Sequence, residues 1–174
     1  MGTFGGHYWR RVVAAGTLAG ALAVGGGAHA ATQVGPTKAI TLRPLSIVKL
    51  RDLEFGRLIA GATAGTVVIN PVTDARATTG GVTAAGSAPL AAQFYTYGTA
   101  NLVMQVTRGP LPVLSRAGGG ATMNVTQLTL NGPITRVLNA AGLIDLRVGG
   151  TLAVGANQLS GSYSGSFNIT VTYF

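Results

Sequence analysis

The chain has 174 residues, of which 12 are Lys or Arg, 4 are Asp or Glu, 2 are His and none is Cys. Without cysteine there is no disulfide, no thiolate metal ligand and no cysteine nucleophile, and four acids leave few pairs for carboxylate chemistry. The length fits one domain. With 47% hydrophobic residues, 27 Gly and only 9% charged residues, the composition indicates a compact all-β domain rather than a disordered chain.

Residues 1–30 have the layout of a secretory signal peptide. A basic stretch ends at Arg10-Arg11, residues 12–24 are apolar, and Ala28-His29-Ala30 supplies the small residues of a cleavage site. The apolar run is shorter than the ~20 residues that cross a bilayer, and the residues around the arginine pair do not fit a twin-arginine signal. We therefore expect ordinary secretion with cleavage near Ala30.

Cleavage would also remove chemistry from the chain. His7, Trp9 and His29 leave with the signal, so the 144 residues that follow hold no His, Cys or Trp. That excludes a Ser-His-Asp triad, the common zinc ligand sets and the usual general base near neutral pH. Ten basic and four acidic residues remain. No later apolar run approaches 18 residues, so the mature form is not expected to span a membrane.

Residues 31–44 are predicted to be either an extended N-terminal tail or the first strand of the domain. Ile40 and Leu42 alternate with their neighbours at the period of a strand, whose successive side chains point to opposite faces. Pro44 then separates this segment from the next strand, because proline cannot donate to a ladder. Ile40 and Leu42 are therefore candidate donor-strand contacts, in a segment that completes the sheet of a neighbouring molecule. The alternative is that they belong to the domain's own first strand.

Residues 45–174 are predicted to form a single domain of many short strands. Alternating or β-branched runs occur at 45–55, 64–70, 94–98, 102–107, 123–130 and 145–152, with Gly, Pro and Asn between them. Residues 72–92 indicate a short strand with long loops, and 134–141 is the only stretch where a helical turn is considered. From Tyr163 to Tyr173 apolar residues alternate with Ser, Asn and Thr, which predicts one long half-buried strand. This pattern is typical of an all-β sandwich or barrel.

Asp52 and Glu54 are the closest pair of acids. Two residues apart on a strand, they share a face, where two carboxylates could serve glycoside hydrolysis or help to bind Ca²⁺. Lys49, Arg51 and Arg57 flank them and favour ordinary surface ion pairs instead. We predict no enzyme activity, no catalytic residue, no metal and no cofactor.

The basic residues are scattered singly, without a basic run or interleaved aromatics, so no nucleic-acid partner is expected. The aromatic residues Phe94, Tyr95 and Tyr97 form a cluster in which Tyr95 and Tyr97 would share one face of a strand and Phe94 the other. Tyr95 and Tyr97 are candidate ligand-facing aromatics. Core or cross-strand packing is the alternative for this pair.

Several segments between residues 45 and 173 together resemble the bacterial secreted family called domain of unknown function 4402. They are Leu53-Glu54-Phe55-Gly56, the run Gly65–Pro71, Gly80-Gly81-Val82, Ala92-Gln93-Phe94, Met123, the run Val148–Leu152 and the run Gly161–Tyr173. Family members often end in Asn, where this chain has Phe174. The layout is similar to that of bacterial surface-fibre subunits assembled by a periplasmic chaperone and an outer-membrane usher. The resemblance implies an immunoglobulin-like, pilin-like antiparallel β-sandwich.

We therefore expect a non-enzymatic secreted surface protein of a bacterium, a fibre or coat subunit that assembles by strand pairing. It would reside in the periplasm or on the outer cell surface. The expected partners are the protein itself or related subunits, with a chaperone and an usher. Fibre subunits of that kind commonly carry a disulfide, and this chain cannot. The alternative function is a soluble periplasmic or extracellular module that binds carbohydrate or another ligand.

Overall fold

The computed structural model describes residues 33–174, so the expected signal peptide at 1–30 lies outside the described residues. Residues 33–45 belong to no strand, and the first strand begins at Ser46. Residues 40–174 form one compact unit. That unit is built from strands and loops without a helix, and within residues 33–174 no helix could serve as a membrane span. The prediction of an all-β chain is confirmed.

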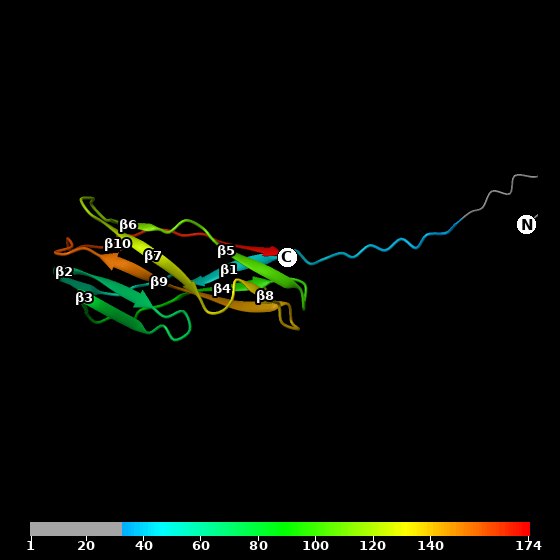
Figure 1. The fold of residues 1–174 in the computed structure, drawn as a ribbon, viewed down its shortest axis with the longest axis horizontal. Helices are drawn as coiled ribbons and strands as arrows, with labels where there is room; N and C mark the ends of the chain where they lie inside the picture. Colours follow the sequence, from blue (N-terminus) through cyan, green and yellow to red (C-terminus); the bar gives the residue numbers. More distant parts are fainter. Residues whose placement is uncertain (1–32) are drawn as a thin grey trace, which may run out of the picture. The chain divides into compact units, whose positions relative to one another are not determined.

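The strands of residues 33–174 make two antiparallel sheets, a β-sandwich (Figure 1). The larger sheet has the order β1-β4-β9-β7-β6-β10, with β2 paired to β9 and β3 to β2; the smaller has the order β11-β5-β8. The strands are β1 (Ser46–Arg51), β2 (Leu58–Ile69), β3 (Arg76–Ala84), β4 (Ala92–Tyr97), β5 (Val103–Arg108), β6 (Val113–Arg116), β7 (Thr122–Leu130), β8 (Thr135–Val137), β9 (Leu143–Val154), β10 (Tyr163–Ser164) and β11 (Ile169–Tyr173).

Strand β9 organises the larger sheet because it changes partner halfway along its length. Its first half pairs with β4 and its second half pairs with β2 on the same edge, while β7 occupies the other edge. The change falls at Gly149-Gly150. A Cβ atom at Gly149 would lie 2.1 Å from the carbonyl oxygen of Ile69, so glycine permits the close approach of β2 at this point.

The hydrophobic core has two parts, and the smaller sheet packs mainly on one of them. Met104 and Val106 of β5 pack with Leu146 of β9, together with residues of β1 and β11. The other part surrounds Ile69 of β2 and Leu152 of β9. Loop residues and Phe167 pack against it, and Ile169 of β11 is the one residue of the smaller sheet that does so within residues 33–174.

The alternation predicted from Tyr163 to Tyr173 is present, but its pairing is divided. The apolar side chains are half-buried and the polar ones exposed throughout. Strand β10 pairs with β6 of the larger sheet, whereas β11 pairs with β5 of the smaller one. Residues 165–168 belong to no strand and carry the chain from one sheet to the other. The single long strand is thus corrected to two strands in two sheets.

Two further segments differ from expectation. Residues 72–92 contain the nine-residue strand β3, so they are less loop-like than their Thr, Gly and Ala content indicated. Residues 134–141 hold strand β8 followed by a turn, and no helical turn. The side-chain oxygen of Asn139 closes that turn by accepting hydrogen bonds from the backbone N–H groups of Ala141 and Leu143, a common use of asparagine at turns.

Candidate functional site

A groove of about 1140 Å³ lies beside the second half of β9, and none of its lining residues belongs to a strand of the smaller sheet. Buried Val125 of β7 and buried Leu152 and Val154 of β9 line its floor. Its two walls are residues 53–60 and residues 158–167. Small-molecule pockets are commonly about 300–1,000 Å³, so this groove has room for an extended peptide segment.

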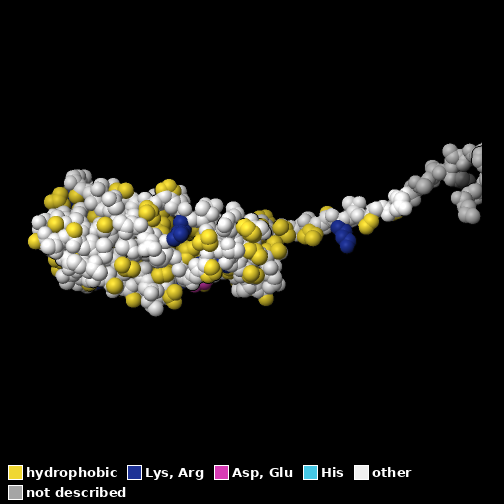
Figure 2. Space-filling view, in the orientation of Figure 1, with side chains coloured by type: hydrophobic (Ala, Val, Ile, Leu, Met, Phe, Trp, Pro, Cys, Tyr) yellow, Lys and Arg dark blue, Asp and Glu magenta, His cyan; other side chains and the backbone are white. Residues whose placement is uncertain are grey.

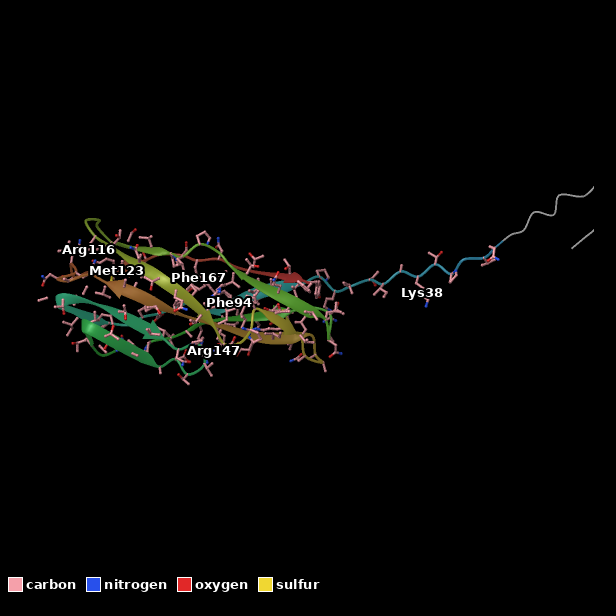
Figure 3. The ribbon with its side chains drawn as sticks, in the orientation of Figure 1. Lys38, Phe94, Arg116, Met123, Arg147 and Phe167 are labelled. Carbon is pink, nitrogen blue, oxygen red and sulfur yellow. The ribbon has the colours of Figure 1, made fainter. Side chains whose placement is uncertain are left out.

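The groove is lined by apolar residues from both walls and from β7, with Ser, Gly and Gln between them in residues 158–167, and it is partly open to solvent. Leu53, Met123 and Phe167 are half-buried, and Leu159 exposes 53% of its surface. Phe167 packs edge-on against Phe94 of β4, with ring centroids 6.3 Å apart (Figure 3). A concave apolar surface that is left partly wet is the property of a binding surface rather than of a closed core.

Both walls also contain main chain outside any strand. Glu54 exchanges two backbone hydrogen bonds with Leu90, of 2.8 and 3.0 Å. Successive residues of an extended chain direct their N–H and C=O groups to opposite sides, so those of Leu53 and Phe55 are directed away from Leu90. The carbonyl of Phe55 accepts from Arg76. In the opposite wall, residues 165–168 lie outside every strand. Such segments can pair with an added strand.

The predicted donor residues Ile40 and Leu42 lie in no strand and are exposed by 87% and 48%. The chain that follows them is held in place at Arg43. The hydroxyl of Tyr173 accepts from the N–H of Thr99 at 2.6 Å and donates to the carbonyl of Arg43 at 2.7 Å, while the N–H of Arg43 donates to Oγ1 of Thr99. The segment before residue 44 is therefore not the first strand of the domain, and its root is fixed beside β11.

Tyr95 and Tyr97 share the outer face of β4, exposed by 40% and 37%, whereas Phe94 points into the core. Their ring centroids are 6.4 Å apart and their planes are nearly perpendicular, at 82°. Val48 of β1 and Asp145 of β9 are the cross-strand neighbours of Tyr95. This patch offers one exposed ring face and one ring edge beside a carboxylate, rather than a continuous flat aromatic platform.

Asp52 forms a surface ion pair of the kind that its flanking cations predict. The ammonium group of Lys49 binds Asp52 at 2.7 Å, and both side chains are mostly exposed. Arg51, expected as a partner of Asp52 and Glu54, lies instead 3.8 Å from Asp74. Among residues 33–174 there is no group of three or more His, Cys, Asp or Glu side chains placed to hold a metal ion.

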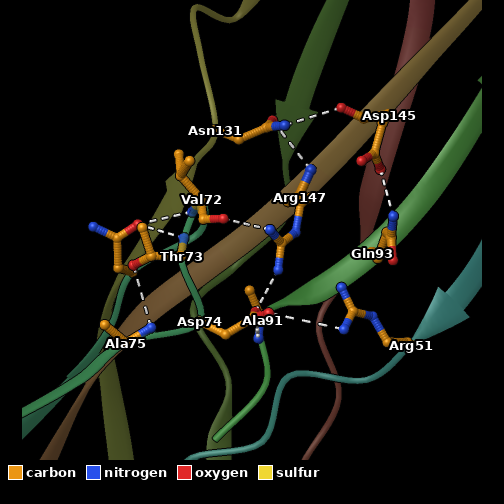
Figure 4. A network of polar contacts seen from close by, with 11 residues as sticks. Arg51, Val72, Thr73, Asp74, Ala75, Ala91, Gln93, Asn131, Asp145 and Arg147 are labelled. Carbon is orange, nitrogen blue, oxygen red and sulfur yellow. Dashed lines mark hydrogen bonds and ion pairs between the residues drawn. The ribbon is translucent and has the colours of Figure 1, made fainter.

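Asp74 forms the centre of a polar network that the sequence did not reveal (Figure 4). Its carboxylate accepts from the backbone N–H of Ala91 at 2.8 Å and binds the guanidinium of Arg147, which also donates to the carbonyl of Val72. Partial burial, the largest single effect, raises the pKa of Asp74. The hydrogen bonds from Ala91 and Arg147 and the charges of Arg147 and Arg51 together outweigh it, so the pKa lies below its ordinary value. The network ties the turn after β2 to β9.

Several other arginines brace loops by donating to backbone carbonyls. Arg76 donates to a carbonyl of the wall at residues 53–60 and to one in the loop before β4. Arg116 of β6 donates to a carbonyl of the chain before β10. On the face shown in Figure 2, Lys and Arg side chains are few and separated. The carbonyls that accept from Arg76, Arg108, Arg116 and Arg136 are those of Phe55, Arg57, Gly86, Leu128, Ser160, Gly119 and Pro133.

Comparison with known proteins identifies one family. Residues 45–173 match the family model described as Domain of unknown function (DUF4402). No curated protein and no solved structure matches the chain. The matched segment includes every strand from β1 to β11 and both walls of the groove, and it leaves out the segment with Ile40 and Leu42. The chain therefore belongs to the DUF4402 family.

Proposed function

We propose that this protein is a non-enzymatic structural subunit of a secreted surface assembly, a fibre or a coat, whose subunits join by strand addition. The groove carries this proposal. Apolar residues such as Ile59 and Leu159 are exposed along it, and none of its lining residues belongs to a strand of the smaller sheet. The exposed segment around Ile40 and Leu42 provides a strand-like sequence without a partner strand in residues 33–174.

Strand addition suits both the apolar side chains of the groove and the main chain of its walls. Side chains of an added strand would remove wall residues such as Leu53 and Leu159 from water, which favours binding by about 25 cal/mol for each Å² of apolar surface. Its main chain could pair with wall segments that now lie outside the sheets. In such recognition the backbone bonds supply affinity and the alternate side chains supply specificity.

The open groove also leads us to propose a chaperone and an usher as partners of this subunit. Exposed apolar surface and unpaired strand edges favour uncontrolled association. A periplasmic chaperone that covers the groove before assembly, and an outer-membrane usher that exchanges it for the next subunit, would meet that need.

Sedimentation velocity of the mature protein, residues 31–174, tests the proposal. We expect species larger than the monomer that grow with concentration, and a monomer at the same concentrations once residues 31–44 are deleted. Urea unfolding of both chains at low concentration checks that the deletion leaves the domain folded. A mature protein that stays monomeric throughout, or a deletion that self-associates equally well, would contradict a subunit joined by this strand.

The second candidate function is carbohydrate binding on the outer face of β4. The exposed pair Tyr95 and Tyr97 beside Asp145 is the observation that favours it. In a glycan screen, Tyr95→Ala should then abolish binding that the unaltered protein shows. An unchanged glycan profile would reject the tyrosine patch as the binding surface.

A further inference from the structure

We propose that the occupant of the groove is residues 34–42 of a second copy of this chain, so that copies join head to tail into an open-ended chain. This inference rests on the proposed function and specifies the partner, the segment and the face that enters the groove.

Residues 34–42 have the side-chain pattern that a groove-filling strand requires. In an extended conformation Val34, Ile40 and Leu42 share one face, and in the single chain they are exposed by 90%, 87% and 48%. The opposite face consists of Gly35, Thr37, Ala39 and Thr41, which are small or polar. The apolar face matches the apolar floor of the groove, and the small face suits the solvent side.

Lys38 is the one charged residue on the apolar face. Its long aliphatic stem lets the ammonium group reach the rim of a groove while the stem remains against apolar surface. Glu54 lines the groove, is exposed, and makes no ion pair with another of residues 33–174. An added strand can therefore place its one cation near an available carboxylate.

The lengths of segment and groove also agree. Nine extended residues span about 30 Å at ~3.3 Å per residue. The walls of the groove comprise residues 53–60 and 158–167, segments of similar size. The inserted strand would lie between the two walls, where no strand of the smaller sheet lines the groove.

The chain's own segment cannot bring Ile40 and Leu42 into its own groove. Its root is held at Arg43 by Tyr173 and Thr99, whereas the nearest groove residue along the chain is Lys49, within β1. To reach the level of Lys49, the chain before Arg43 would have to fold back alongside β1. That distance takes about six extended residues at ~3.3 Å each. Those residues would be 37–42, so both apolar anchors would lie beside β1 before the groove is reached. A second copy has no such restriction.

The two contact surfaces lie on different parts of the same body. The donor root is next to β11, and the acceptor groove lies over β7 and the second half of β9. A contact between two different surfaces is heterologous, and such contacts generate open chains unless a rotation happens to close a ring. Every assembly would therefore keep one empty groove at one end and one free donor segment at the other.

The absence of cysteine from the chain allows a direct test. Single cysteines are introduced at Ala39, Ile40, Thr41 and Leu42 of the mature chain, and the alkylation rate by iodoacetamide is measured in assemblies and in dilute monomer. We expect assembly to slow alkylation at positions 40 and 42 by at least ~10-fold, and at positions 39 and 41 by less than ~3-fold. This two-residue period identifies a strand whose apolar face is buried.

One variant inside the groove and one control variant outside it link that protection to this groove. Leu159→Asp places a charge on a wall residue that is 53% exposed, and Ile134→Asp places one on a residue that is 48% exposed and outside the groove. We expect the first to abolish assembly and protection, and the second to leave both unchanged.

The outcomes separate the inference from the proposed function. Assemblies in which all four cysteines react alike, or in which Leu159→Asp has no effect, overturn the inference but leave a structural subunit joined by another surface. Protection of positions 40 and 42 that is already present in the dilute monomer shows that a chain fills its own groove, and it also overturns the inference. If no variant and no concentration produces an assembly, the proposed function itself fails.

Discussion

Replacement of Asp74 by Asn removes a negative charge that several parts of the fold share. Asp74 has a positive φ of 61°, a conformation that Asn also tolerates, so the variant changes the charge and not the backbone. Ala91 and Arg147 both donate to Oδ1 of Asp74, so the amide oxygen of Asn can still accept from both. The charge attraction to Arg147 and Arg51 is lost, and the amide nitrogen replaces Oδ2, the oxygen nearest Arg51.

The exposure of the two side chains sets the expected magnitude. Arg147 exposes 15% and Asp74 27% of their side chains. Exposed ion pairs contribute about 0–1 kcal/mol, and breaking a buried pair costs about 3–5 kcal/mol. The Asp74–Arg147 pair lies between these limits, so we expect a loss of about 2 kcal/mol. For a chain of this size that corresponds to a fall of about 6 °C in Tm.

Asp52→Asn is the matched control, because it removes the same charge from an ion pair whose side chains are 58% and 70% exposed. We expect it to cost less than ~0.5 kcal/mol. Urea unfolding followed by circular dichroism measures both variants, since the chain after residue 30 has no tryptophan.

A double-mutant cycle of Asp74→Asn with Arg147→Met should give a coupling free energy of about 1 kcal/mol or more. If Asp74→Asn costs no more than Asp52→Asn, or if the coupling is below ~0.3 kcal/mol, the network does not stabilise the fold as described.

Three further predictions concern Asp74, Gly65 and Tyr173. The pKa of Asp74 in the folded chain lies below its ordinary value of 3.8, so its stabilisation is complete above that pH and is lost as the pH falls further; in acid titrations the stability gap to Asp74→Asn should narrow below pH ~4. Gly65→Ala should cost about 1–3 kcal/mol in urea unfolding, because its Cβ would lie 2.0 Å from the carbonyl of Thr79, whereas Gly35→Ala, with nothing within 4 Å, should be silent. Tyr173→Phe removes the hydroxyl that holds the donor root and should speed hydrogen exchange at the N–H of Arg43.

Much of the local structure could be predicted because a strand with one buried face has a period of two residues. The alternation from Tyr163 to Tyr173 gives the correct buried and exposed faces, and Tyr95 and Tyr97 share a face as their spacing predicts. The same pattern does not say which strand is the neighbour. Strand β10 pairs with β6 and strand β11 pairs with β5, but in the sequence the two strands look like one.

Of the proposed donor segment and its groove, the sequence suggests only the segment. Ile40 and Leu42 stand out because they lie close together in sequence, but the groove is assembled from wall segments about a hundred residues apart. The network of Asp74 and Arg147 joins residues 73 positions apart. Leu53 and Phe55 alternate like a strand, and only the folded chain shows that they lie outside the strands, beside the single bridge between Glu54 and Leu90.

By itself, the sequence determined the chemistry that this protein lacks and the faces that its strands present. The absence of cysteine excludes a disulfide, a thiolate metal ligand and a cysteine nucleophile, and local alternation assigns buried and exposed positions, because both depend only on residue identity and spacing. The tertiary structure decided how the strands divide between two unequal sheets, and which segments come together as the walls of the groove. That division depends on long-range pairing, as when β9 exchanges β4 for β2 at Gly149-Gly150, and no local pattern encodes the partner.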